Sequence, residues 1–119
     1  MKPNVLKDKS FVFAVRIVNL YKFLSNNKKE FILSKQVLRS GTAIGALYRE
    51  AEHAESKLDF IHKLAIAQKE CNETVYWLDL LKETDYLDPI EHESISKDCD
   101  ELMALLVSII KSAKENNTK

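Results

Sequence analysis

The residues whose spacing best suits chemistry are two carboxylate–imidazole pairs, Glu50-x-x-His53 and Asp59-x-x-His62. On a helix this spacing places both groups on one face, which is how di-iron helical bundles present some of their ligands. If the helices that carry the two pairs run antiparallel about residue 55, all four groups lie at one end of the bundle. Di-iron sites also need inward carboxylates from two further helices, and the other helical segments offer none. We therefore predict no metal site and interpret these groups as solvated charges of a helical hairpin.

The same antiparallel pairing sets Arg39 level with Glu70 and Glu73. Carboxylates could perform acid–base work, but no nucleophile or partner base accompanies them. A guanidinium suits two carboxylates, so we predict an interhelical ion pair. Lys35, one turn before Arg39, could contact phosphate, although such a pair more commonly marks a solvated helical face. The sequence has no glycine-rich phosphate loop, nucleophile elbow, Cys-x-x-Cys pair or zincin helix, so we predict no catalytic residue and no cofactor.

The elements that would carry these residues are four helices, expected at about 10–25, 34–54, 56–83 and 89–114. Ser10 suits the N-cap of the first helix, and Ser56 followed by Asp59 suits a capping box for the third. Asp88 before Pro89 suits the start of the fourth, because proline lacks an N–H that the first turn would leave unpaired.

Apolar residues recur at three- and four-residue steps, as they do on the inward faces of bundled helices. The first helix carries such a stripe at Phe11, Ala14, Ile17, Val18, Tyr21 and Leu24. The fourth carries a heptad pattern at Ile95, Cys99, Leu102, Leu106, Ile109 and Ala113. Further apolar residues fall off the seams, at Val12, Phe13, Trp77, Leu80, Met103 and Ile110. On a monomer they would form exposed patches, so we predict self-association.

The 119 residues are enough for one domain, which we expect to span 1–119. Glycine and proline together are only four residues, and no strand pattern competes, so the prediction is an all-α, up-down-up-down four-helix bundle. Gly41 and Gly45, four residues apart, predict close approach of a neighbouring helix. No stretch approaches the roughly 18 apolar residues that span a bilayer, which predicts no membrane partner. Cys71 and Cys99 lie in apolar patterns and fit a reducing cytoplasm.

Charge is unevenly distributed along a chain whose formal net charge is zero. Residues 1–40 hold nine Lys/Arg against two Asp/Glu, whereas residues 81–119 hold five against nine. A basic surface is therefore possible on a neutral protein, since the two ends of the chain carry opposite charge.

Two runs of sequence resemble a known family. The first is Gln36-Val37-Leu38-Arg39-Ser40-Gly41-Thr42-Ala43-Ile44-Gly45-Ala46-Leu47-Tyr48-Arg49-Glu50-Ala51; the second is Ser56-Lys57-Leu58-Asp59-Phe60-Ile61-His62-Lys63-Leu64-Ala65-Ile66-Ala67, followed by Glu70, Asn72-Glu73-Thr74 and Tyr76-Trp77-Leu78. They resemble the bacterial four-helix-bundle proteins encoded in intervening sequences of large-subunit ribosomal RNA genes. The resemblance implies a left-handed bundle that is often a homopentamer around a central channel. A related protein, the accessory variability determinant of diversity-generating retroelements, binds nucleic acid and a reverse transcriptase through a basic surface.

The sequence thus leaves three functional hypotheses. The first is a non-catalytic, oligomeric interaction protein that contacts RNA or DNA through Lys35, Arg39, Arg49 and the basic first segment. The second is a scaffold that binds another protein and no nucleic acid. The third and most distant is a metal-dependent enzyme using Glu50, His53, Asp59 and His62.

Overall fold

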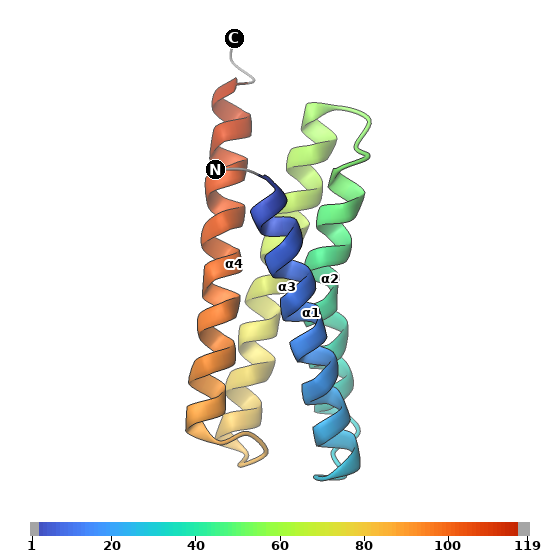
Figure 1. The fold of residues 1–119 in the computed structure, drawn as a ribbon, viewed down its shortest axis with the longest axis vertical. Coiled ribbons are helices and arrows are strands. Elements are labelled where there is room, and N and C mark those ends of the chain that lie inside the picture. Colours follow the sequence, from blue (N-terminus) through green and yellow to red (C-terminus); the bar gives the residue numbers. More distant parts are fainter. Residues whose placement is uncertain (1–2, 117–119) are drawn as a thin grey trace.

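Four antiparallel helices make up residues 3–116, the part of the chain that the computed structural model describes (Figure 1). They are α1 (Pro3–Asn26), α2 (Leu33–Ala51), α3 (Lys57–Glu83) and α4 (Pro89–Asn116). Each helix packs against the next along the chain, and α1 closes the bundle against α4 with the least extensive contact. Residues 3–116 contain no strand. The predicted all-α, up-down-up-down bundle is confirmed.

The starts of α3 and α4 are set by local capping. Ser56 Oγ accepts the Asp59 backbone N–H at 3.0 Å, and Asp59 Oδ2 in turn accepts the Glu55 backbone N–H at 3.3 Å. At α4, Asp88 Oδ1 accepts the Glu91 backbone N–H at 2.8 Å, directly before Pro89 at the first helical position. Side-chain acceptors of this kind satisfy N–H groups that the first turn of a helix leaves unpaired.

Two of the predicted helix boundaries were wrong. α1 begins at Pro3, and Ser10 lies buried inside the helix, where its hydroxyl donates to the Lys7 carbonyl at 3.1 Å. The helix extends this far because Leu6, one turn before Ser10, is fully buried and continues the inward face. At its other end, α2 stops at Ala51, three residues earlier than predicted, and residues 52–56 form the turn into α3.

The inward face of α1 also differs from the predicted stripe. Leu6, Phe13, Ile17, Leu20 and Leu24 are buried, whereas 57 % of Phe11 is exposed. Two helical phases fit the apolar residues of this segment, since Phe11 and Phe13 are both aromatic and only two positions apart. Burial of Leu6 and Ser10 selects the phase that turns Phe13 inward.

Because α1 is turned in this way, the exposed apolar side chains are not the ones that were predicted. Among the residues predicted to lie off the seams, Phe13 and Ile110 are buried, and Trp77, Leu80 and Met103 are partly buried. Val12 alone of that set is exposed. Of the six residues predicted to form exposed patches, only Val12 does so, and much of the exposed apolar surface lies on α1.

No helix within residues 3–116 has the length and apolar character needed to cross a membrane.

Candidate functional site

Arg39 is held by two carboxylates on α3. Its Nη1 lies 3.3 Å from Glu70 Oε1, and its Nη2 contacts Glu73 Oε2. Glu73 also accepts the Trp77 indole N–H at 3.0 Å, and this hydrogen bond, with the Arg39 guanidinium, lowers the pKa of the Glu73 carboxyl. This is the interhelical pairing expected from helices aligned about residue 55. Because its charge is already balanced, Arg39 is a poor phosphate contact.

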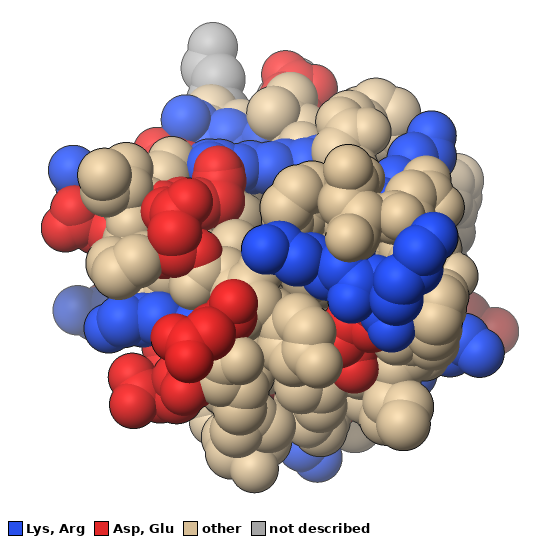
Figure 2. Space-filling model, turned by 90° about the horizontal axis from the view of Figure 1, so that it is seen from below, with Lys and Arg blue, Asp and Glu red and all other residues tan. Residues whose placement is uncertain are grey.

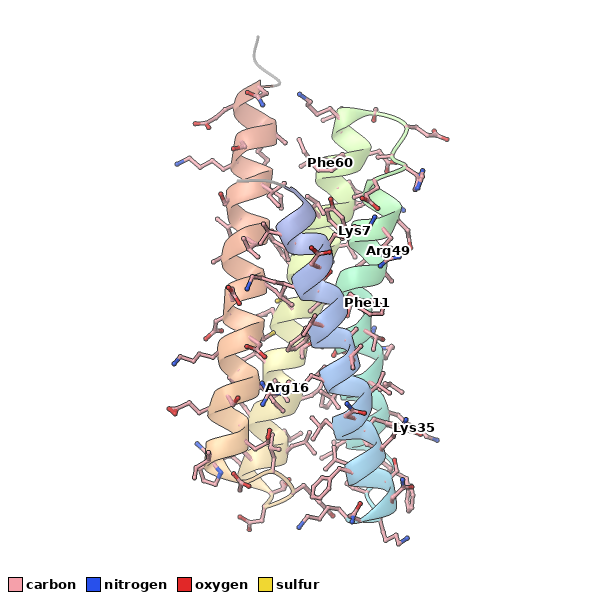
Figure 3. All side chains as sticks on the ribbon, in the orientation of Figure 1. Lys7, Phe11, Arg16, Lys35, Arg49 and Phe60 are labelled. Atoms are coloured by element: carbon pink, nitrogen blue, oxygen red, sulfur yellow. The ribbon has the colours of Figure 1, made fainter. Side chains whose placement is uncertain are left out.

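Lys35 and Arg49, the other two predicted nucleic-acid contacts, are both exposed on α2 but lie far apart (Figure 3). Fourteen residues of helix separate them, which corresponds to about 21 Å along the axis. Arg49 places its guanidinium carbon 5.7 Å from the centre of the Phe11 ring, across the α1–α2 junction. Neither side chain forms an ion pair within the described part of the chain. Lys35, Arg39 and Arg49 therefore do not form one cluster of free cations.

The two carboxylate–imidazole pairs meet at the turn between α2 and α3 but do not converge. Glu50 Oε1 accepts a hydrogen bond from Lys63 Nζ at 3.0 Å, and Asp59 is engaged in capping α3. His53 and His62 are exposed. Across residues 3–116, no three His, Cys, Asp or Glu side chains come together in a group that could hold a metal ion.

Arg16 forms a second interhelical network that sequence reasoning missed. Its Nη1 lies 2.9 Å from Asp98 Oδ2, and its Nη2 lies 2.9 Å from Glu91 Oε1 and 2.8 Å from Ser94 Oγ. The partners are 75–82 residues away along the chain, so no local spacing could have identified them. The network links α1 to α4, the pair of helices with the least extensive contact.

Cys71 and Cys99 face each other in the core between α3 and α4. Their Sγ atoms are 3.5 Å apart, both residues are buried, and neither is in a disulfide. The contact with Cys71, together with burial, raises the pKa of the Cys99 thiol, which disfavours a reactive thiolate. We interpret this pair as small core side chains.

An open hollow of about 790 Å³ lies between the second half of α1 and the α3–α4 turn. Its walls combine apolar residues such as Phe23 and Leu87 with Lys28 and Lys82 on one hand and Asp85 on the other. Because both charge signs line it, the hollow shows no preference for an anionic or a cationic small molecule.

The outward side of α1 exposes a row of apolar residues that we call the α1 face: Val5, Phe11, Val12 and Val15. Their exposed fractions are 36 %, 57 %, 66 % and 46 %. Figure 3 shows Phe11 beside Arg49, where α1 and α2 meet. The i, i+4 and i, i+7 spacing of these residues places them on one side of the helix.

The profile of the 23S rRNA-intervening sequence protein family matches residues 2–108. The match takes in α1, α2 and α3 and continues well into α4. This chain belongs to that family.

A solved structure similar to this intervening-sequence family protein is a crystal structure from Bacteroides thetaiotaomicron VPI-5482, of a protein with unknown function from the S23 ribosomal protein family. The two sequences are 64 % identical, and the match covers 93 % of this chain and 99 % of that one, with a TM-score of 0.92. No curated protein matches the chain. At this identity the relative shares the four-helix arrangement described above.

Proposed function

We propose that this intervening-sequence family protein is a non-catalytic interaction protein that assembles with copies of itself through the α1 face. The observation that carries the proposal is the exposure of Phe11, Val12 and Val15 side by side on one helix. Contiguous apolar patches on soluble proteins commonly mark interaction sites. Full burial of a valine or phenylalanine contributes about 1.5–3 kcal/mol, so several such residues can offset an association cost of about 4–15 kcal/mol.

The α1 face does not fix how many chains the assembly contains. The sequence resemblance implies a ring of five, whereas the α1 face is compatible with any closed arrangement, because cyclic assemblies of different size can use the same patch. We place the assembly in the cytoplasm, since the facing Cys71 and Cys99 thiols fit a reducing compartment.

Light scattering at a few micromolar protein tests the assembly. We expect a stable mass that is a multiple of 13.7 kDa. A mass near that of one chain would defeat the proposal, whereas a multiple other than five would defeat only the stoichiometry taken from the resemblance.

Weak association with RNA or DNA is a second candidate function, favoured by the exposed cations Lys35 and Arg49, neither of which forms an ion pair among the described residues. Because these two cations are far apart and Arg39 is neutralised, the three predicted contact residues together reach few phosphates. Binding that rests on exposed cations should fall steeply with added salt. We expect Lys35→Glu with Arg49→Glu to weaken binding to mixed-sequence RNA at low salt, and Lys111→Glu on α4 to leave it unchanged. Undetectable binding by the unaltered protein would favour a scaffold that contacts protein alone.

A further inference from the structure

One end of the bundle separates positive from negative charge. The α1–α2 and α3–α4 turns both lie at this end (Figure 1). We call residues 22–35 the lysine half, with four lysines and one glutamate for a net charge of +3. We call residues 82–93 the acidic half, with one lysine and five acids for a net charge of −4. Figure 2 looks onto this end and shows acidic side chains gathered mainly on the side of α3 and α4.

The positive charge of the lysine half is available to a partner. Lys22, Lys28, Lys29 and Lys35 are all exposed, and none forms an ion pair with the rest of residues 3–116. The one acid, Glu30, is buried and does not offset them at the surface. Its carboxylate instead accepts three backbone N–H groups at the start of α2, at 2.7–3.2 Å.

The negative charge of the acidic half is only partly used within the chain. Glu91 pairs with Arg16, and Asp88 caps α4. Glu83 and Asp85 are exposed and have no ion pair among the residues that the structure describes. Glu93 is likewise exposed and outside these ion pairs, so three acids without an ion pair lie across the end from four lysines without one.

Apolar side chains accompany both charged halves. On the lysine half 53 % of Phe31 and 75 % of Ile32 are exposed, and on the acidic half 84 % of Ile90 is exposed. A largely exposed isoleucine on each half gives the end apolar area to bury as well as charge to match.

We propose that this end docks onto the same end of a second copy, related by a two-fold axis that runs along the boundary between the two halves. That rotation lays the lysine half of each copy on the acidic half of the other. A two-fold contact of this kind uses one self-complementary patch twice. A nucleic acid would be attracted by the lysine half and repelled by the acidic half, whereas a second copy satisfies both.

The contact is small and depends on salt. The bundle is 52 Å long but only 23 by 19 Å across, so its end offers much less area than its sides. Interfaces that bury under about 1,200 Å² in total are typically weak. Exposed charges attract over about 8 Å at physiological ionic strength and over less as salt is added. The end contact goes beyond assembly through the α1 face, because it uses other residues. In a ring whose chains all point the same way, it joins two rings and doubles the mass that the α1 face produces.

Two charge reversals test this contact by sedimentation at about 10 µM and about 500 µM protein in low salt, a range suited to a weak interface. Lys28→Glu with Lys29→Glu changes the lysine half from +3 to −1, which leaves the end at −5. Glu83→Lys with Asp85→Lys changes the acidic half from −4 to 0, which leaves the end at +3. The unaltered protein should double its mass as concentration rises, and each variant alone should not. An equimolar mixture of the two variants should double again, because each end then meets one of opposite charge. Thermal melting of each variant checks that the bundle remains folded.

The result is separable from assembly through the α1 face. If the α1 face did not mediate assembly but the end contact did, the mass would rise from that of one chain to that of two as the protein concentration increases. The end contact would be overturned if the unaltered protein and both separate variants doubled their mass equally. It would also be overturned if a mixture of the folded variants did not double in mass. Neither result would bear on the α1 face. Doubling that strengthens in high salt would also overturn the end contact, since screening should weaken opposed charges.

Discussion

Gly41 of α2 lies directly against Ile17 of α1, so that a Cβ at position 41 would stand 2.8 Å from Ile17 Cγ1 and 2.9 Å from Cγ2. Both contacts are with a branched, fully buried side chain that has little freedom to move. The close approach of α1 and α2 at this level therefore depends on the absence of a side chain at Gly41.

Gly41→Ala should lower the free energy of unfolding by about 1–3 kcal/mol through overpacking, even though alanine favours a helix by about 1 kcal/mol over glycine. Gly45→Ala is the matched control, because its Cβ would first meet Ser10 Oγ at 3.2 Å and should cost less. Urea denaturation of the three proteins measures the difference. A stabilised Gly41→Ala protein would show that α1 shifts away without cost.

Arg39→Ala should cost no more than about 1 kcal/mol, because about half of the Arg39 side chain is exposed and exposed ion pairs contribute little. The cost should shrink further in high salt, as screening weakens the pair with Glu70 and Glu73. Lys57→Ala, at an exposed lysine of α3, provides the control. A loss of several kcal/mol would indicate that the pair is buried in the assembled protein, where removing one partner strands two acids.

Stability should fall as the solution is acidified below about pH 4.5, partly because of Glu30. Burial raises the pKa of Glu30, but hydrogen bonds from the backbone of Leu33, Ser34 and Ile32 outweigh it and leave the pKa below its ordinary value of 4.5. The unfolded chain therefore binds the proton first, and the stabilisation present above pH 4.5 is lost as pH falls through the folded pKa.

Glu30→Gln should remove that part of the pH dependence while lowering stability at pH 7, since an amide oxygen is a weaker acceptor than a carboxylate. Urea titrations between pH 7 and pH 3 measure both effects. Glu55→Gln, at an exposed glutamate, should leave the profile unchanged. Equal pH profiles for Glu30→Gln and the unaltered protein would show that the cap contributes nothing to acid sensitivity.

Phe11→Ser with Val12→Ser should reduce the native mass to fewer chains and leave the melting temperature of the bundle almost unchanged. Both side chains are largely exposed, so their removal takes apolar area from the interface rather than from the core. Val107→Ser is the control, because Val107 is half-exposed on α4 and lies outside the α1 face. If the control variant loses mass and the α1 variant retains it, assembly uses α4 instead.

The parts of the fold that sequence predicted well are those encoded within a single turn or a single helix. Ser56 with Asp59 and Asp88 with Pro89 mark helix starts through hydrogen bonds that span three or four residues. The α4 heptad was also correct, because Ile95, Cys99, Leu102, Leu106 and Ile109 are all buried. The Arg39 contacts with α3 follow from a short turn that fixes the register of α2 against α3.

By itself the sequence determined four amphipathic helices, their order and their short connections, since helix period and capping are local properties. Only the tertiary structure decided which way α1 faces. Phe11 and Phe13 suit the core equally by residue type, and packing of α1 against α2 and α4 leaves Phe13 buried and Phe11 exposed. The Arg16 network and the opposed charges at one end arise in the same way, because they join residues that are distant in sequence and adjacent only when the bundle closes.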